Sequence, residues 1–592
     1  MSHFVNGVNS CVTQSLEGIA LSSFGNLVLV RNRDVILMNP ERAGIQGKVA
    51  IVCGGGSGHE PAHSSFVNRE MLSAAICGDV FASPGVGAIT DGIRALAGNR
   101  EKTQTGVLVI IKNYTGDRMN FGMACEILSS EGFLLKKLIV ADDVSLPETK
   151  DRRGVAGTVL VYKIAGALAL RLQKGNSDMQ QKLDKVYEIA EKVNSNIHSM
   201  GCALSSCHRP DGSTIFALPE GEMEIGVGIH GERGVLRRPV KSCDEIVSVL
   251  IDAILAAKQE HERKNSRITD NKRMVLLTNN LGSVSGLEMG IVHRKAILYL
   301  REKGCEVCRA YCGTYMTSLD MRGISLTLLS VADDIFLDLL DADGSDFTRT
   351  NWKPDRDYSP LSSSIYIDVP ASPDMDYDMS GSSSANGETV DQEFMSIVGK
   401  VCKAGMEARE TLNNLDSESG DGDAGDTLAT ACNAIERNIR SVSVSDTSMA
   451  FRRIARCLVN TVGGTSGSLY AVFFHRAAAA FCSHAGSKKG KEWKSVSRWE
   501  EAIYHGIFGI EELGGCSRGD KTFLDALYPV YDALKGKTEA GIDHFVRAAK
   551  DGAEKTRDLE AQAGRARYVQ GKGLGKVDPG AFAVYLLLRA IL

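Results

Sequence analysis

The sequence predicts an α/β domain over residues 1–340, a linker over 341–389 and an all-α domain over 390–592. Short apolar runs separated by glycine turns predict the first domain. A stretch rich in Ser, Gly, Asp and Pro predicts the linker, and helical periodicity predicts the second domain. With 592 residues, the chain is long enough for each domain to bury its own core.

The strands of the first domain are predicted from four apolar runs, at residues 48–53, 106–111, 138–141 and 274–278. Each run is short and continuous, which is typical of a strand buried on both faces of a sheet. Helix-length segments separate the runs, so we expect a largely parallel sheet with helices packed on it.

The linker and the second domain follow from a change in composition. Residues 380–387 read Ser-Gly-Ser-Ser-Ser-Ala-Asn-Gly, which favours a flexible tether over a packed core. After Val390 the apolar residues recur at helical spacing, as in Phe394, Ile397 and Val401. The second domain is therefore predicted to be all α.

The composition excludes several classes of protein. Lys and Arg total 68 against 73 Asp and Glu, so the net charge of -5 offers no basic surface for nucleic acid or an anionic membrane. The most apolar stretch, residues 469–482, is interrupted by His475 and Arg476 and is too short to span a bilayer. Fifteen cysteines are too few for a disulfide scaffold and no secretory signal begins the chain, so we expect a soluble, cytoplasmic protein.

A glycine-rich motif follows the first buried strand and reads Gly54-Gly55-Gly56-Ser57-Gly58-His59-Glu60-Pro61. Consecutive glycines let the backbone approach a small ligand, and Ser57 and His59 add polar groups. The motif is neither a Walker A loop nor a Rossmann fingerprint, because it lacks Gly-Lys-Ser/Thr and has His59 in place of the last glycine. The alternative is a tight structural turn.

A second polar segment, from Lys112 to Asp117, follows the strand at 106–111. Ligands bind at the carboxyl ends of such strands, where Lys112 could polarise an oxygen and Asp117 could take a proton. The alternative is a solvated loop with an ordinary ion pair.

A lone histidine, His230, stands at the predicted end of an alternating strand over residues 223–229. The two preceding positions on its face, Gly226 and Gly228, have no side chains, which predicts space for a small molecule against the imidazole. The alternative is a histidine with a purely structural role.

An acidic loop in the second domain carries Asp416, Asp421 and Asp423, with glycines that allow the carboxylates to converge. Carboxylates held together repel each other unless a cation neutralises them, so the loop predicts a hard divalent metal. An EF-hand is excluded because no Glu stands at the twelfth position, and the alternative is an acidic solvent loop.

Two further glycine loops, residues 463–468 and 514–522, precede helices of the second domain. Amide groups at a helix N-terminus favour an anion, so these loops predict phosphate binding. Together with the metal loop they predict a nucleoside triphosphate.

In this order, the four motifs at 54–61, 112–117, 226–231 and 420–423 resemble those of the dihydroxyacetone kinase family, in its fused two-domain form. The resemblance implies an α/β N-terminal kinase domain of two subdomains that holds a triose. It also implies a C-terminal antiparallel barrel of eight helices that carries ATP.

The resemblance also implies roles for individual residues. His230 matches the histidine that binds the substrate carbonyl as a hemiaminal, and Asp117 is placed to deprotonate the attacking hydroxyl with help from His59. The other residues implied around the triose are Gly56, Ser57, Gly58 and Lys112. Asp416, Asp421 and Asp423 match Mg2+ ligands, and the implied nucleotide contacts are Asp421, Gly422, Asp423, Ala424, Thr465, Ser466, Gly514, Thr522, Phe523, Asp578, Pro579 and Gly580. Ala424 departs from relatives that often carry Cys or His there.

The function implied is ATP-dependent phosphorylation of dihydroxyacetone, and of glyceraldehyde, by a homodimer that uses Mg2+. One alternative is splitting of FAD to riboflavin cyclic phosphate and AMP at the same nucleotide site, with Mn2+ or Co2+. Another is a non-catalytic protein that senses triose.

Overall fold

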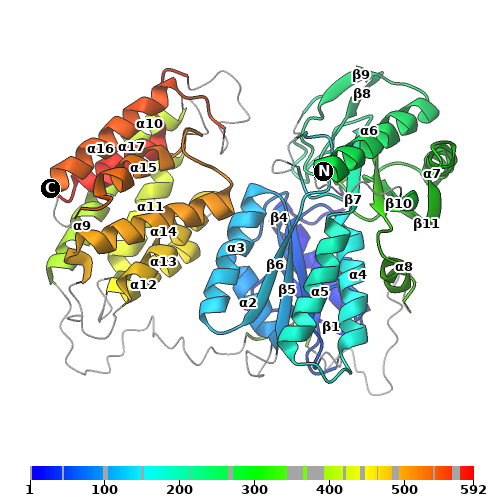
Figure 1. Ribbon diagram of the computed structural model, residues 1–592, viewed down its shortest axis with the longest axis horizontal. Coiled ribbons are helices and arrows are strands. Elements are labelled where there is room, and N and C mark those ends of the chain that lie inside the picture. The colour runs from blue at the N-terminus through cyan, green and yellow to red at the C-terminus, as the bar shows by residue number, and fades with distance from the viewer. Residues whose placement is uncertain are drawn as a thin grey trace. The chain divides into compact units, whose positions relative to one another are not determined.

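A computed structural model describes residues 3–42, 46–97, 105–147, 152–214, 216–264, 271–342, 364–369, 392–417, 422–439, 447–462, 464–482, 492–537, 541–562 and 574–592. The chain forms two compact units, Met1–Ala371 and Ser372–Leu592. The first unit is α/β and the second is helical (Figure 1).

The first sheet of the N-terminal unit has seven strands in the order β13-β1-β2-β4-β3-β5-β6 (Figure 1). Only β2 runs against its neighbours, so the expectation of a largely parallel sheet is confirmed here. The strands are β1 (Leu27–Val30), β2 (Val35–Met38), β3 (Ala50–Ser57), β4 (Ala74–Val80), β5 (Gly106–Lys112), β6 (Leu134–Val140) and β13 (Tyr366–Ile367). Strand β13 lies inside the segment predicted as a linker and belongs to this sheet.

Helices cover this sheet in two pairs. Helix α2 (Val86–Ala97) packs against α3 (Thr115–Ser130), and α4 (Thr158–Leu172) packs against α5 (Met179–Asn194). The two pairs lie on opposite sides of the sheet (Figure 1). Helix α1 (Cys11–Ser22) packs against β1. The central strands β3 and β5 are consequently buried along their whole length, as their continuous apolar sequence predicts.

The second sheet of the N-terminal unit has six strands in the order β11-β10-β12-β7-β8-β9. The strands are β7 (Ile197–Ala203), β8 (Glu222–Ile225), β9 (Leu236–Pro239), β10 (Arg273–Asn280), β11 (Glu306–Gly313) and β12 (Gly323–Ser330). Helices α6 (Cys243–Lys264) and α7 (Gly286–Glu302) share its core, and α8 (Ile335–Leu340) packs on α4.

Most neighbours in this second sheet are antiparallel, and only β10 and β11 run parallel. The expectation of parallel strands is therefore wrong for this sheet. Two connections in this sheet run through helices, β9 to β10 through α6 and β10 to β11 through α7, but β9 and β10 are not neighbours. Apolar runs alone reveal neither strand order nor strand direction.

The helices of the second unit pack in a closed sequence of neighbours. Each of α11, α12, α13, α14, α15, α16 and α17 packs on the helix before it, and α9 packs on both α11 and α17. The helices are α9 (Gln392–Glu407), α10 (Arg409–Ser417), α11 (Ala424–Ile439), α12 (Thr447–Thr461), α13 (Gly464–Ala477), α14 (Val496–Gly514), α15 (Leu524–Leu534), α16 (Ile542–Lys555) and α17 (Pro579–Arg589). This all-α unit is the one the periodicity predicts.

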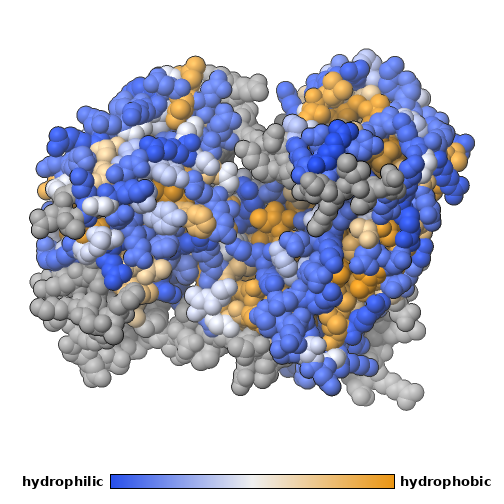
Figure 2. Space-filling view, viewed as in Figure 1, coloured by the Kyte–Doolittle hydropathy of each residue, from blue (hydrophilic) through white to orange (hydrophobic). Residues whose placement is uncertain are grey.

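The surface of each unit is largely polar on the face shown in Figure 2. Within the described ranges, no helix has both the length and the apolar character needed to cross a membrane. All fifteen cysteines are free thiols.

Candidate active site

A buried ion pair joins the ends of two adjacent elements in the first unit. Lys112 is the last residue of β5, and its Nζ lies 3.2 Å from Oδ2 of Asp117 in the first turn of α3. The side chains are 0% and 4% exposed. Lys112 also donates to the Gly54 carbonyl at 2.5 Å, and the Ser83 hydroxyl donates to Asp117 at 2.5 Å. The segment is therefore no solvated loop, because water reaches neither charge.

The glycine run makes room for this pair, but it belongs to a strand. Strand β3 continues to Ser57, so the prediction that it ends at Cys53 is wrong. A Cβ on Gly55 would lie 2.3 Å from Lys112 Nζ, and a Cβ on Gly56 would lie 2.7 Å from the Ala82 nitrogen. These positions require glycine because a lysine side chain and a neighbouring backbone occupy the space.

The predicted polar groups of the motif have different surroundings. Ser57 donates its hydroxyl to the Gly78 carbonyl at 2.7 Å, so β4 already binds it. Gly58 has φ +95° and faces Phe81 and Leu319, which a side chain there would meet. His59 is fully buried and follows directly.

The structure brings His59 and His230 together. Their ring centroids are 4.7 Å apart and the rings are nearly perpendicular. Phe81 stacks on His59 at 5.2 Å and Tyr114 meets His230 edge-on at 4.4 Å. Two predicted histidines from distant parts of the chain thus share one aromatic cluster.

The protonation of His59 follows from its surroundings. Burial, the neighbouring His230 and the Lys112 charge hold the pKa of His59 well below its usual range. Nδ1 lies 2.9 Å from the Thr317 carbonyl, which only accepts, so Nδ1 carries the proton. Nε2 is then an unprotonated acceptor, and it has no partner among the described residues. This nitrogen is available to accept a hydrogen bond, although the lowered pKa makes the ring a weak base.

His230 lies in a loop rather than at a strand end, because β8 stops at Ile225. The space beside the two preceding glycines is filled by protein. A Cβ on Gly226 would lie 2.8 Å from Ser145, and a Cβ on Gly228 would lie 2.2 Å from Glu232. The prediction that these glycines clear room for a ligand is therefore wrong: they clear room for side chains that support the site.

Two further residues near the histidines, Glu232 and Tyr114, were not predicted from the sequence. Glu232 accepts hydrogen bonds from both the backbone N–H and Nδ1 of His230. Tyr114 stands at the N-terminus of α3 with a buried hydroxyl that has no partner among the described residues. Their sequence positions, two residues from His230 and inside the 112–117 segment, are the signal that could have identified them.

One predicted metal ligand of the acidic loop in the second unit, Asp416, binds the backbone of the loop itself. Asp416, near the end of α10, is 9% exposed, and its Oδ2 accepts the backbone N–H groups of Gly422, Asp423 and Ala424 at 2.9–3.1 Å. It therefore caps the start of α11. Asp423 is exposed, and Asp421 lies outside the described residues. No group of three potential metal ligands converges in the part of the chain that the structure describes.

Several predicted nucleotide contacts gather around the start of α17. Asp578 caps that helix by accepting from the Ala581 nitrogen at 2.7 Å. Burial, with the negative charges of Asp525 and Asp416, raises the pKa of Asp578 to about 7. A Cβ on Gly580 would lie 3.3 Å from Phe523, whose ring meets Tyr470 of α13 at 6.1 Å. Phe523, directly before α15, thus lies beside both the start of α17 and the middle of α13.

The loop before α15 is held by Asp525. Its carboxylate accepts from the Gly519 nitrogen at 2.6 Å and from the Thr522 nitrogen at 2.8 Å. The remaining predicted contacts lie at helix ends: Thr465 and Ser466 in the first turn of α13, Gly514 as the last residue of α14, and Pro579 as the first of α17.

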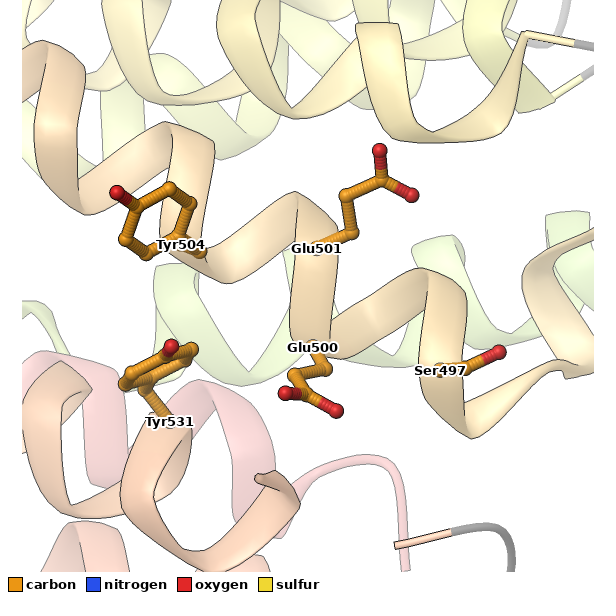
Figure 3. A pocket seen from close by; sticks show the side chains of 5 residues that line it. All are labelled: Ser497, Glu500, Glu501, Tyr504 and Tyr531. Carbon is orange, nitrogen blue, oxygen red and sulfur yellow. The ribbon is translucent and has the colours of Figure 1, made fainter. Parts of the chain in front are cut away.

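A surface hollow of about 340 Å³ lies elsewhere on the second unit, between α14 and α15 (Figure 3). Its lining residues are Ser497, Glu500, Glu501, Tyr504 and Tyr531, none of which is a predicted site residue. Glu500 accepts from the Gly536 nitrogen at 3.1 Å. The hollow is open and separate from the clusters described above.

Comparison with known proteins identifies the family. The Dak1 domain matches residues 17–347 and the DAK2 domain matches residues 418–592. Triokinase/FMN cyclase of Mus musculus is 35% identical, covering 99% of this chain and 98% of its own, and the Homo sapiens protein of that name is 34% identical with the same coverage. The crystal structure of the dihydroxyacetone kinase from C. freundii in complex with AMP-PNP and Mg2+ is 31% identical, covers 100% and 99% of the two chains, and superposes with a TM-score of 0.50. This chain therefore belongs to the dihydroxyacetone kinase family.

Proposed function

We propose that this protein transfers the γ-phosphate of ATP to dihydroxyacetone, and to glyceraldehyde. The observation that carries the proposal is the buried cluster of His59, Lys112, Asp117 and His230 within the Dak1 match. A family that includes triokinases, and a solved relative that binds AMP-PNP and Mg2+, support the same reaction.

We propose that His230 holds the triose by adding to its carbonyl carbon. Addition selects ketones and aldehydes against glycerol, which has no carbonyl, so specificity needs no large pocket. The crowded aromatic walls of Phe81 and Tyr114 fit a small substrate.

Asp117 is the proposed base for the attacking hydroxyl. Its carboxylate is held by Lys112 and Ser83, which fix its direction, and burial keeps competing water away. Lys112 would also favour negative charge on a substrate oxygen. His59 Nε2 assists as a second acceptor, and Gly56, Ser57 and Gly58 shape the wall.

The residues of the second unit fit Mg-ATP on the chemistry of their donors. The negative charges of Asp416 and Asp525 both act on the carboxylate of Asp578, so a cation nearby is favourable. Asp416 keeps its Oδ1 for this purpose, and Asp423 and Asp421 are the other proposed ligands. Mg2+ would neutralise the charge of the phosphates during in-line transfer. The helix starts at Thr465, Thr522 and Gly580 supply N–H groups to phosphates.

The assembly is also a proposal. The closed sequence of packed helices supports an eight-helix barrel, with the short α10 as an addition. We propose a homodimer in the cytoplasm, where fifteen free thiols are stable.

The test is product identification after incubation with Mg-ATP and each triose. We expect triose phosphate and ADP from dihydroxyacetone and glyceraldehyde, and none from glycerol. Release of no ADP with either triose would favour the alternative of a non-catalytic sensor.

A second activity is favoured by the relatives named triokinase/FMN cyclase. We propose that the nucleotide site also splits FAD to riboflavin cyclic phosphate and AMP with Mn2+ or Co2+. Chromatography of FAD incubated with each ion tests this activity without any triose.

A further inference from the structure

We propose that Glu232 is the positioning residue of His230, selecting the imidazole tautomer whose Nε2 is free to attack the substrate carbonyl. The inference deepens the proposed kinase function and rests on it. It assigns a role to a carboxylate that neither the motifs nor the family comparison singled out.

The contacts of Glu232 define this role. Its Oε2 accepts the backbone N–H of His230 at 2.8 Å, and its Oε1 lies 3.3 Å from Nδ1 of the same residue. The carboxylate of Glu232 therefore binds both the backbone N–H and the ring of His230. The imidazole is 18% exposed and the carboxylate 31%, so the pair stands at the edge of the site.

The charge of Glu232 fixes which atom carries the proton. Burial alone would raise the pKa of Glu232. The hydrogen bond from His230 and the charge of Arg153 outweigh burial and lower this pKa to about 2. An ionised carboxylate only accepts, so Nδ1 must be the donor and Nε2 must be the atom with the free lone pair. Free histidine prefers the opposite arrangement only slightly, so a single charge-assisted contact decides the tautomer.

Arg153 and Gly228 hold the carboxylate of Glu232 beside His230. Arg153 is anchored by Asp143 at 2.6 Å and by the Gly226 carbonyl at 2.7 Å. A Cβ on Gly228 would lie 2.2 Å from Glu232 Oε2 and 2.7 Å from Arg153 Nη1. Position 228 therefore requires glycine, because a side chain there would displace the carboxylate of Glu232.

The covalent step balances with these groups. Nε2 donates its lone pair to the carbonyl carbon, forming the N–C bond as the C=O π bond breaks. The oxygen gains one proton from solvent, and Nδ1 passes its proton through Glu232 back to solvent. The net change is addition of the imidazole N–H across the carbonyl, with no oxidant or reductant.

The experiment uses the full-length enzyme and dihydroxyacetone labelled with 13C at the carbonyl. NMR of the labelled carbon follows adduct formation, and 15N-histidine labelling reports the tautomer of His230, assigned with His230→Gln. For Glu232→Gln we expect adduct formation roughly 10–100-fold slower and a loss of the Nδ1–H form. Glu232→Asp should restore part of both.

Gly228→Ala provides an independent variant that leaves Glu232 in the sequence but displaces its carboxylate, and it should shift the tautomer in the same direction. Glu222→Gln is the matched charge control, because Glu222 lies on β8 and its partly exposed carboxylate lies 3.8 Å from Arg237. Gly290→Ala is the matched glycine control, since among the described residues no atom beyond its own stretch of α7 lies within 4 Å of the added Cβ. Both controls should behave as wild type.

The outcomes separate the two hypotheses. A wild-type enzyme that phosphorylates dihydroxyacetone without any adduct would overturn covalent capture, whatever the variants do. Wild-type adduct formation with an unchanged rate and tautomer in Glu232→Gln would overturn the role of Glu232 alone. A slower rate with an unchanged tautomer would also overturn it, because a merely structural loss lowers the rate without moving the proton.

Discussion

The two candidate sites are built in different ways. In the first unit, buried side chains hold one another: Lys112 and Asp117 are 0% and 4% exposed, and the His59 ring lies against His230. In the second unit, the carboxylates of Asp416 and Asp525 accept hydrogen bonds from backbone N–H groups of nearby loops. The candidate triose site is assembled from side chains that contact one another, and the candidate nucleotide site from helix starts and the carboxylates that hold them.

This difference fits the two proposed tasks. Capturing a small triose requires a nucleophile and a base in fixed positions, which burial and close packing provide. Binding a triphosphate requires many N–H donors and a cation, which loops at helix N-termini provide. We therefore expect substitutions of the mutually bonded side chains in the first site to affect stability and chemistry together, and substitutions in the second site to affect chemistry and loop order.

The largest effect is expected for Asp117→Asn. Turnover should fall about 10²–10⁴-fold because the proposed base is lost. The free energy of unfolding should fall by about 3 kcal/mol because the buried Lys112 charge loses its partner. Urea denaturation and steady-state kinetics measure the two effects. Asp184→Asn is the control, since that carboxylate pairs with Lys136 at 2.6 Å but is 48% exposed, and should change neither. Near-normal turnover in Asp117→Asn would contradict the assignment.

The next effect concerns the second site. Asp423→Asn should lower turnover roughly 10²-fold through loss of a metal ligand, without disturbing triose binding in the other unit. Asp416→Asn should do the same and also loosen the start of α11, because three N–H groups lose their shared acceptor. Turnover titrated with Mg2+ and hydrogen exchange of the loop distinguish the two variants. Turnover within a few-fold of wild type for Asp423→Asn at saturating Mg2+ would count against a metal role.

A smaller effect, on stability, is expected from pH. Burial and the charges of Arg152, His261 and Lys258 lower the pKa of His198 to about 3. The unfolded chain takes up that proton near pH 6.5, so this contribution to stability is complete above pH 6.5 and declines as the pH falls toward 3. The slope is at most about 1.4 kcal/mol per pH unit. His59 and His63, whose pKa values burial also lowers, act in the same direction.

Urea denaturation of wild type and His198→Gln at pH 7 and pH 5 measures the His198 contribution. The variant should lose less stability between the two pH values. Circular dichroism follows the helices of both units. An equal loss of stability in both proteins would remove His198 from the explanation.

The layers of the fold could be predicted from the sequence because the evidence for them is local. A buried strand followed by polar residues also singled out His59, Lys112 and Asp117, which the structure buries; their roles stay predictions. What fills the space beside a glycine is not local, so Gly226 and Gly228 were assigned to the ligand when they accommodate Ser145 and Glu232. Glu232 itself has no periodic or motif signal, because it acts through a loop whose path only the fold determines.

The smallest effect is expected for Tyr114, and it tests the comparison between the two candidate sites most directly. Its hydroxyl is buried against His230 and has no partner among the described residues. If the triose supplies that partner, Tyr114→Phe should raise the KM about 2–12-fold, the equivalent of one net hydrogen bond of about 0.5–1.5 kcal/mol, and should leave the unfolding free energy of the empty protein unchanged. Tyr162→Phe is the matched control: its hydroxyl is equally buried and without a described partner, but its ring lies against His63 in the core of the unit. That variant should leave both KM and stability unchanged. A Tyr114→Phe enzyme that is less stable with an unaltered KM would mean that the hydroxyl binds within the protein, and Tyr114 would then belong to the side chains of the first site that hold one another.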